Sequence, residues 1–127
     1  MQGLEWKIYL ITLDIDRPNM FRAGWAADYP DPHNFMNIFT CNGGNNETGW
    51  CSEDYDKKIN QASYELSFEK RKEIYIEAQN KLLYDENVII PLFISNQIYL
   101  KNKRIEKLSF SKMGIIDFKK IEVLPKN

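Results

Sequence analysis

The sequence predicts a mixed α/β fold in which about three helices pack on a small, incomplete sheet. Three observations predict it. Apolar residues recur at helical spacing between Ser67 and Leu83, with charged residues between them. From Val88 onward the pattern changes to short apolar runs of strand length. A chain of 127 residues, 43% of them hydrophobic, can bury a modest core.

The N-terminal part of the chain gives the least decisive pattern. Trp6–Leu13 is apolar enough for a helix or a strand, and its periodicity does not decide between them. Asp14–Asn19 is expected to form a turn because Pro18 interrupts regular structure. Met20–Trp25 is then expected to be a short buried strand.

Three helices are expected in the middle of the chain. The first begins at Pro32 with Asp31 as its N-cap, because a carboxylate accepts hydrogen bonds from the free amides of a first turn and proline suits the first helical position. Ser52 caps the second, and Ser67 caps the third. The apolar positions of the helices are Phe35, Ile38 and Phe39, then Tyr55, Ile59 and Ala62, then Ile74, Tyr75, Ala78, Leu82 and Leu83.

Strands are expected after the third helix. Their predicted ranges are Val88–Ile94, Gln97–Leu100, Ile105–Phe110 and Lys119–Leu124. Pro91 cannot donate a ladder hydrogen bond, so it marks a sheet edge, a bulge or a crossing between layers. These strands are too few and too scattered to form a sheet alone.

Charge and hydropathy exclude several classes of protein. The 17 basic residues balance 18 acidic ones, for a net charge of −1, which argues against nucleic-acid binding, where a basic stripe is expected. The longest apolar stretch, Val88–Ile94, is too short to span a membrane. The opening MQGLEW lacks the features of a secretory signal, although an exported protein stays compatible with the sequence if the chain is a piece of a longer one.

Asp28, in the stretch FRAGWAADYPDP, is the strongest candidate binding residue. It follows the expected strand, and Pro30 biases Tyr29 towards an extended conformation, so the carboxylate has a nearly fixed direction. Ligands of open α/β sheets bind beyond the carboxyl ends of the strands. Beside Trp25, the carboxylate suits an ammonium group through a charge-assisted hydrogen bond and a cation–π contact.

Structural interpretations of the same residues stay open. Asp28 could be a turn residue bonded to its own backbone amides, and Trp25 could pack in the core. Arg22 could pair with Asp28, hold another acid or face solvent. Asp31 is explained by its place as a helix cap.

The two cysteines, Cys41 and Cys51, lie in one polar loop, CNGGNNETGWC. We rank a disulfide first, because the flexible loop allows the two thiols to meet. Free thiols in a reducing compartment rank second. A zinc site ranks third, because the cysteines and the single His33 give at most three ligands without CxxC spacing.

The stretch RAGWAADYPDPHNFMNIFTCNGGNNETGWCSEDYDKKINQA resembles the C-terminal part of the oligopeptide- and dipeptide-binding proteins of ABC importers, the extracellular solute-binding proteins of family 5. Trp25, Asp28, Asp31 and Pro32 match the family pattern in order. Downstream, RKEIYIEAQNKLLYDENVIIPLF resembles the family's helix and its exit into a strand. The matching positions there are Arg71, Tyr75, Ala78, Gln79, Asp85, Ile90 and Pro91.

The resemblance runs from about Leu4 to Leu100 and fades beyond Asn102. Members of the family are longer and have two lobes that close on the ligand. The resemblance therefore implies that residues 1–127 are a single domain, the C-terminal part of the second lobe of a type II periplasmic-binding-protein-like fold. Residues 101–127 would return towards the first lobe, which is missing here.

The resemblance also implies roles for individual residues. The acid at the position of Asp28 binds the α-amino group of a peptide, while Trp25 and Ala26 give wall and backbone contacts and Arg22 lies close by. Some members carry a disulfide in the loop after the first helix, which supports pairing of Cys41 with Cys51. The implied location is periplasmic or otherwise extracytoplasmic.

The expected function is substrate binding for a peptide ABC importer, without catalysis, cofactor or metal. The expected partners are a peptide ligand, the missing N-terminal lobe, ABC permease subunits and, through exposed strand edges, a second copy of the fragment. The alternatives are a receptor for nickel, haem or sugar, or a small interaction fragment. An enzyme using Asp28 and Asp31 as a carboxylate pair is a weaker alternative, because no nucleophile and base accompany them.

Overall fold

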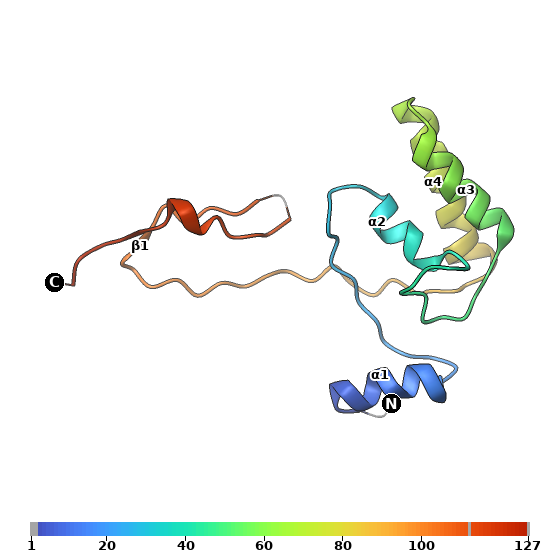
Figure 1. Ribbon diagram of the computed structural model, residues 1–127, viewed down its shortest axis with the longest axis horizontal. Coiled ribbons are helices and arrows are strands. Elements are labelled where there is room, and N and C mark those ends of the chain that lie inside the picture. The colour runs from blue at the N-terminus through green and yellow to red at the C-terminus, as the bar shows by residue number, and fades with distance from the viewer. Residues whose placement is uncertain (1–2, 112, 127) are drawn as a thin grey trace.

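The computed structural model describes residues 3–111 and 113–126 (Figure 1). The mixed α/β class is confirmed. The helices are α1 (Trp6–Ile15), α2 (His33–Met36), α3 (Glu53–Tyr64) and α4 (Phe68–Asn80), and the strands are β1 (Ile105–Glu106) and β2 (Glu122–Val123). Short helical turns cover Asn37–Phe39, Lys81–Asp85 and Phe118–Lys120.

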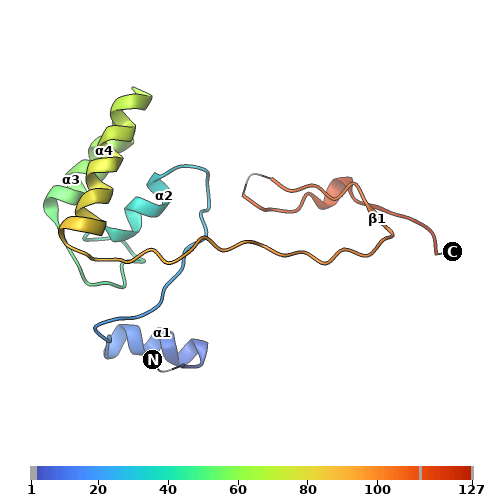
Figure 2. The same cartoon turned by 180° about the vertical axis from the view of Figure 1, so that it is seen from behind.

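The arrangement of the layers differs from the expected helices on a sheet. Helices α2, α3 and α4 pack against one another in one body, as both views show (Figures 1 and 2). A long extended segment leads from α4 to a C-terminal arm, where β1 and β2 pair antiparallel with Ile105 opposite Val123. The helices therefore build the core on each other, and the small sheet lies away from them.

The core of the helical body is centred on Tyr55 and Leu82, both fully buried. Ile59, Ala62, Tyr75 and Ala78 are buried with them, as the helical stripes predicted. The Tyr55 hydroxyl donates a hydrogen bond of 2.7 Å to the carbonyl oxygen of Met36, which ties α3 to α2. Because burial disfavours the phenolate, the pKa of Tyr55 is raised.

The bounds of α3 agree with the sequence signals. The Ser52 hydroxyl accepts a hydrogen bond from the backbone amide of Tyr55. The first turn carries acidic residues, whose negative charges interact favourably with the positive N-terminal end of the helix dipole. Helix α4 also begins where expected, after Ser67, although the Ser67 side chain makes no capping bond. It runs into a π-helical turn at Lys81–Asp85, which places Leu82 in the core.

The first expected helix is short, and its apolar face is shifted. Helix α2 begins at His33, and the residues that it buries are Asn34 and Met36. The predicted core residue Phe35 is 45% exposed. The helix therefore turns a polar side chain inward, towards the loop that precedes it.

The N-terminal segment is a helix, which resolves the ambiguity of Trp6–Leu13. The Glu5 carboxylate caps α1 by accepting hydrogen bonds from the amides of Lys7 and Ile8. Leu13 is the residue that α1 buries, while Trp6 is 66% exposed. No helix in the described residues is long and apolar enough to cross a membrane.

The predicted strands are mostly unpaired. Met20–Trp25 is not a strand, and Met20 is 79% exposed. Val88–Ile94 and Gln97–Leu100 have no ladder partner within the described part of the chain. The two C-terminal predictions shorten to the two residues each of β1 and β2. These strands were predicted from short apolar runs, whose residue types favour extended structure. A strand also needs a neighbouring strand for its backbone hydrogen bonds, and residues 3–111 and 113–126 supply none for these segments.

We expect Leu82→Ala to lower the free energy of unfolding by about 3 kcal/mol, because it leaves a cavity where the side chain is 2% exposed. Urea denaturation followed by circular dichroism measures this change. Leu66→Ala is the matched control, since Leu66 is 99% exposed and its truncation should change stability by less than about 0.5 kcal/mol. Equal losses from both variants would contradict the assignment of the core.

Candidate functional site

The loop before α2 is anchored by an ion pair between Asp31 and Arg71 of α4. The guanidinium donates two parallel hydrogen bonds to the carboxylate, of 2.7 and 2.8 Å. Asp31 also accepts a hydrogen bond of 2.8 Å from the backbone amide of His33. It thus binds the first helical residue as predicted, although the N-cap position itself is Pro32, one residue after the predicted Asp31. Arg71 further donates to the carbonyl oxygen of Ala62, so one side chain joins the loop, α3 and α4.

This pair changes the acidity of Asp31. The hydrogen bonds from Arg71 favour the carboxylate and lower the pKa of Asp31 below its ordinary value, with a smaller contribution from the His33 amide. Both side chains are 29% exposed. Because both carboxylate oxygens are engaged, Asp31 acts as an anchor of the loop.

Asn34 connects the two predicted binding residues. Its side chain is buried, and its oxygen accepts a hydrogen bond of 2.7 Å from the indole nitrogen of Trp25. Its amide nitrogen donates to Asp28 Oδ2 at 3.4 Å. One buried amide therefore orients the indole and contacts the carboxylate.

Asp28 itself is exposed at the edge of a small hollow. Within the described residues, the Asn34 amide is the one donor to its carboxylate, so an oxygen remains free for a ligand. The hollow holds about 220 Å³ and lies between Trp25, Asp28 and Tyr29 on one side and, on the other, α2 with the turn after it and the Gly43–Asn45 turn. That size suits the end group of a ligand better than a whole drug-sized molecule.

The other predicted site residues lie outside this arrangement. The Arg22 guanidinium lies over the ring of Phe93, 5.8 Å from its centroid, and it makes no ion pair with Asp28. The Arg22 carbonyl accepts a hydrogen bond of 2.6 Å from the Tyr9 hydroxyl. Ala26 is exposed next to Trp25. The structure thus brings together Asp28 and Trp25, and it separates Arg22 from them.

Two residues of the site escaped the sequence reasoning. Arg71 was noted only as a family position, since its partner Asp31 lies 40 residues earlier. The sequence indicated the burial of Asn34 only weakly. Asn34 stands four residues before Ile38, so the two residues share a face of the expected helix, and that face was predicted to be apolar.

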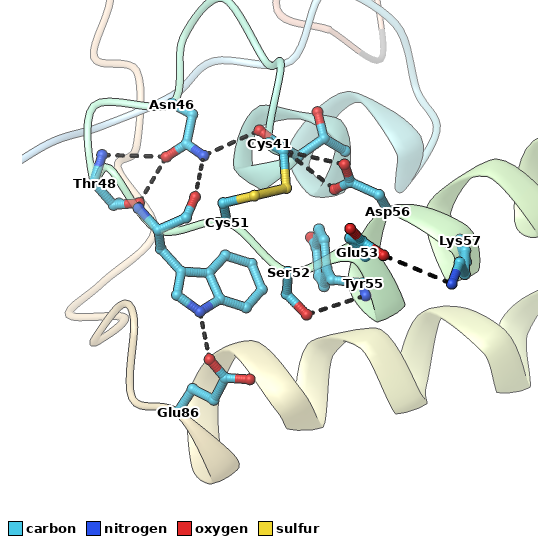
Figure 3. The surroundings of a disulfide bond; sticks show 12 residues. Cys41, Asn46, Thr48, Cys51, Ser52, Glu53, Tyr55, Asp56, Lys57 and Glu86 are labelled. Atoms are coloured by element: carbon cyan, nitrogen blue, oxygen red, sulfur yellow. Dashed lines mark hydrogen bonds and ion pairs between the residues drawn. A yellow bond between two sulfur atoms is a disulfide. The ribbon is translucent and has the colours of Figure 1, made fainter.

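A disulfide between Cys41 and Cys51 closes the loop beside the hollow (Figure 3). Asn46 holds this loop from inside by donating hydrogen bonds to the carbonyl oxygens of Thr40 and Trp50. The Asp56 carboxylate of α3 accepts from the Cys41 amide at 3.0 Å. The loop that supplies one wall of the hollow is therefore fixed both covalently and to α3.

Gly43 is required in that wall. A Cβ atom at Gly43 would lie 2.5 Å from the Ile38 carbonyl oxygen, so only glycine allows the turn to approach the end of α2.

A second, larger hollow of about 450 Å³ lies on the C-terminal arm. Three lysines border it, Lys107, Lys119 and Lys120, and two of them form ion pairs, Lys107 with Glu122 and Lys120 with Asp117. It contains none of the predicted binding residues, and the smaller hollow remains the candidate site.

Comparison with known proteins confirms the resemblance. No protein-family model matches the chain. The chain is 29% identical to the dipeptide-binding protein DppE of Bacillus subtilis over 119 residues, which are 94% of this chain and 22% of DppE. It is 29% identical over 120 residues to the oligopeptide-binding protein OppA of the same organism, with the same coverage of 94% and 22%.

A third relative extends the match to another bacterium. The periplasmic oligopeptide-binding protein OppA of Salmonella typhimurium is 31% identical over 107 residues, which are 84% of this chain and 19% of that protein. The chain spans about a fifth of the length of the curated relatives it matches. It is therefore similar to one segment of peptide-binding proteins.

We expect Asp31→Asn to lower the free energy of unfolding at pH 7 by about 2 kcal/mol, because it removes a charged acceptor from Arg71. The folded-state pKa of Asp31 is lowered, so its contribution is complete above about pH 4, the unfolded value, and is lost as pH falls through the folded-state pKa. Urea unfolding at several pH values between 2 and 7 checks this.

The control for this variant is Asp85→Asn, which removes an exposed carboxylate after α4. It should change the free energy of unfolding little at any of these pH values. A loss in Asp31→Asn that stays equally large in acid would contradict the charge-based account.

We expect reduction of the Cys41–Cys51 bond to lower the free energy of unfolding by about 3 kcal/mol, because it frees a loop of 10 residues in the unfolded chain. Thermal unfolding with and without a reductant measures the change, and mass spectrometry after thiol alkylation counts the free thiols. The Cys41→Ser/Cys51→Ser double variant should match the reduced protein and no longer respond to reductant. A double variant as stable as the oxidised protein would contradict the expectation.

Proposed function

Because the chain is similar to peptide-binding proteins over 94% of its length, we propose that it is part of the substrate-binding component of a peptide ABC importer. In this proposal Asp28 binds the α-amino group of the peptide. The observation that carries it is the exposed Asp28 carboxylate, with an oxygen free among the described residues, beside an indole at the rim of a small hollow.

The chemistry of the site supports an ammonium ligand. A carboxylate oxygen accepts a charge-assisted hydrogen bond from an ammonium group, and this bond is stronger than one between neutral groups. The Trp25 side chain is fixed by Asn34 and 40% exposed, so its face is available to a cation. A free amino terminus has the charge that this site would select.

The half of the site present here would bind weakly alone. Asp28 faces solvent, where water screens its attraction for a cation. The relatives are about five times longer than the matched segment, and a second lobe would exclude that water. We infer that residues 1–127 form a single domain, the C-terminal part of a second lobe, with residues 101–127 returning towards the first.

The partners and location follow from the same proposal. The chain would act with the missing N-terminal lobe and with ABC permease subunits, outside the cytoplasm. The Cys41–Cys51 disulfide supports that location, because such bonds persist in oxidising compartments. The negative charge of the exposed Asp28 carboxylate favours an amine-bearing ligand over a metal ion, haem or a sugar.

A chimera tests the binding role. The matched 119-residue segment of the Bacillus subtilis dipeptide-binding protein DppE is replaced by this chain, and dipeptide binding is measured by calorimetry. We expect the chimera to bind dipeptides with a free amino terminus. Asp28→Asn in the chimera should weaken that binding at least 30-fold, since a hydrogen-bonded charge pair contributes about 2 kcal/mol or more.

N-acetylated dipeptides provide the internal control, because they lack the ammonium group. Their weaker binding should be the same with Asp28 and with Asn at this position. The matched control variant is Asp85→Asn, which removes an acid from the turn after α4 and should leave binding unchanged. Equal effects of Asp28→Asn on free and acetylated peptides would exclude the assigned role.

A further inference from the structure

Asn34 of α2 lies between the two groups that are proposed to bind an ammonium group. It is 7% exposed and, tyrosines aside, it is the one polar or charged residue that is buried in the described part of the chain. Its backbone is fixed as well, because its amide donates a hydrogen bond of 3.1 Å to the carbonyl oxygen of Asp31. A buried carboxamide is costly unless its polar atoms have partners. The side chain of Asn34 finds these partners in Trp25 and Asp28.

The indole of Trp25 decides which way the Asn34 amide is turned. An indole N–H donates a hydrogen bond and cannot accept one. The atom of Asn34 that lies 2.7 Å from Trp25 Nε1 is therefore the amide oxygen. The NH₂ group, on the other branch of the same carboxamide, then faces Asp28 Oδ2 at 3.4 Å. Without the indole, the amide would be free to turn its oxygen towards the carboxylate, and two acceptors repel each other.

This orientation suits the recognition of an ammonium group. The NH₂ group contacts Asp28 at Oδ2, so within the described residues Oδ1 is left for a ligand. The amide oxygen holds the edge of the Trp25 ring, which leaves the face of the ring for a cation. One buried side chain therefore sets both the carboxylate and the aromatic wall.

We propose that Asn34 is a positioning residue for ammonium recognition, and that Trp25 acts through it by turning a donor, rather than an acceptor, towards Asp28. The inference rests on the proposed function of Asp28. It adds that selectivity for a free amino terminus depends on the ordered series of indole, amide and carboxylate, and not on the carboxylate alone.

The stability of the fold should depend little on this amide. Leucine has nearly the shape of asparagine. Trp25 is 40% exposed and Asp28 is exposed, so water can replace the bonds that Asn34 makes with them. We therefore expect Asn34→Leu to leave the urea midpoint of the full chain nearly unchanged, because neither partner is left buried and unpaired. A positioning role is thus separable from a structural one.

Binding by the chimera with the dipeptide-binding protein DppE tests the positioning role. Calorimetry compares dipeptides with a free amino terminus and their N-acetylated forms. We expect Asn34→Leu to weaken binding of the free dipeptide about tenfold, the effect of one hydrogen bond to a charged group, and to leave the acetylated form unaffected. The matched control is Asn60→Leu, the same change at an exposed position of α3, which should alter neither.

A second variant tests the link between the indole and the amide. Trp25→Phe keeps an aromatic ring but has no N–H, so it no longer fixes the orientation of Asn34. We expect it to weaken binding of the free dipeptide too. In the Asn34→Leu background the same change should weaken binding by less than about twofold, because there is no amide left to orient.

The indole itself can be observed in the full chain by proton–nitrogen NMR. The Trp25 signal is assigned from its loss in Trp25→Phe. We expect its N–H to exchange with solvent about tenfold faster in Asn34→Leu, because the bond to the amide oxygen is gone. The N–H of Trp50, which donates to Glu86, is the internal control and should not change.

The outcomes distinguish this inference from the proposed function. If Asp28→Asn does not reduce the preference of the chimera for free over acetylated dipeptides, the proposed function itself fails. If Asp28→Asn removes that preference and Asn34→Leu retains it, the inference about Asn34 is overturned. Equal weakening of both peptides by Asn34→Leu, a large loss of stability, additive effects with Trp25→Phe, or unchanged exchange at Trp25 would each overturn it as well.

Discussion

The double hydrogen bond between Arg71 and Asp31 is the contact on which the arrangement of the site depends. It ties the loop before α2 to α4, while the Arg71 bond to Ala62 adds the end of α3. Once Asp31 is fixed, α2 starts two residues later, and Asn34 points back at the loop. Asn34 then holds Trp25 and contacts Asp28. The position of an exposed carboxylate is thus set by a chain of contacts that begins in the helical body.

The two acids of the loop differ in what remains free. Asp31 has both oxygens bound by a cation and an amide, so it stabilises the fold and has little left for a ligand. Asp28 receives one long hydrogen bond of 3.4 Å in the described part of the chain. Two carboxylates three positions apart therefore differ in their capacity for a further contact, because Asp31 has a guanidinium partner and Asp28 does not.

The success of prediction from sequence followed the range of the interactions involved. Helix α3 was predicted with its cap, because Ser52, the acids after it and the stripe through Tyr55 are all local signals. The strand expected at Met20–Trp25 failed because pairing depends on distant chain. Asp31 was understood as a cap, but its bond to Arg71, 40 residues away, could not be read from local pattern. Asp28 and Trp25 were proposed as binding residues from their neighbours in the sequence, whereas the buried Asn34 that contacts both was not singled out.

The Cys41–Cys51 disulfide makes one wall of the hollow depend on the redox state of the surroundings. In an oxidising medium the bond restricts the loop that contains the Gly43–Asn45 turn. In a reducing medium the same loop would rely on noncovalent contacts, such as those of Asn46 with Thr40 and Trp50 and of Asp56 with Cys41.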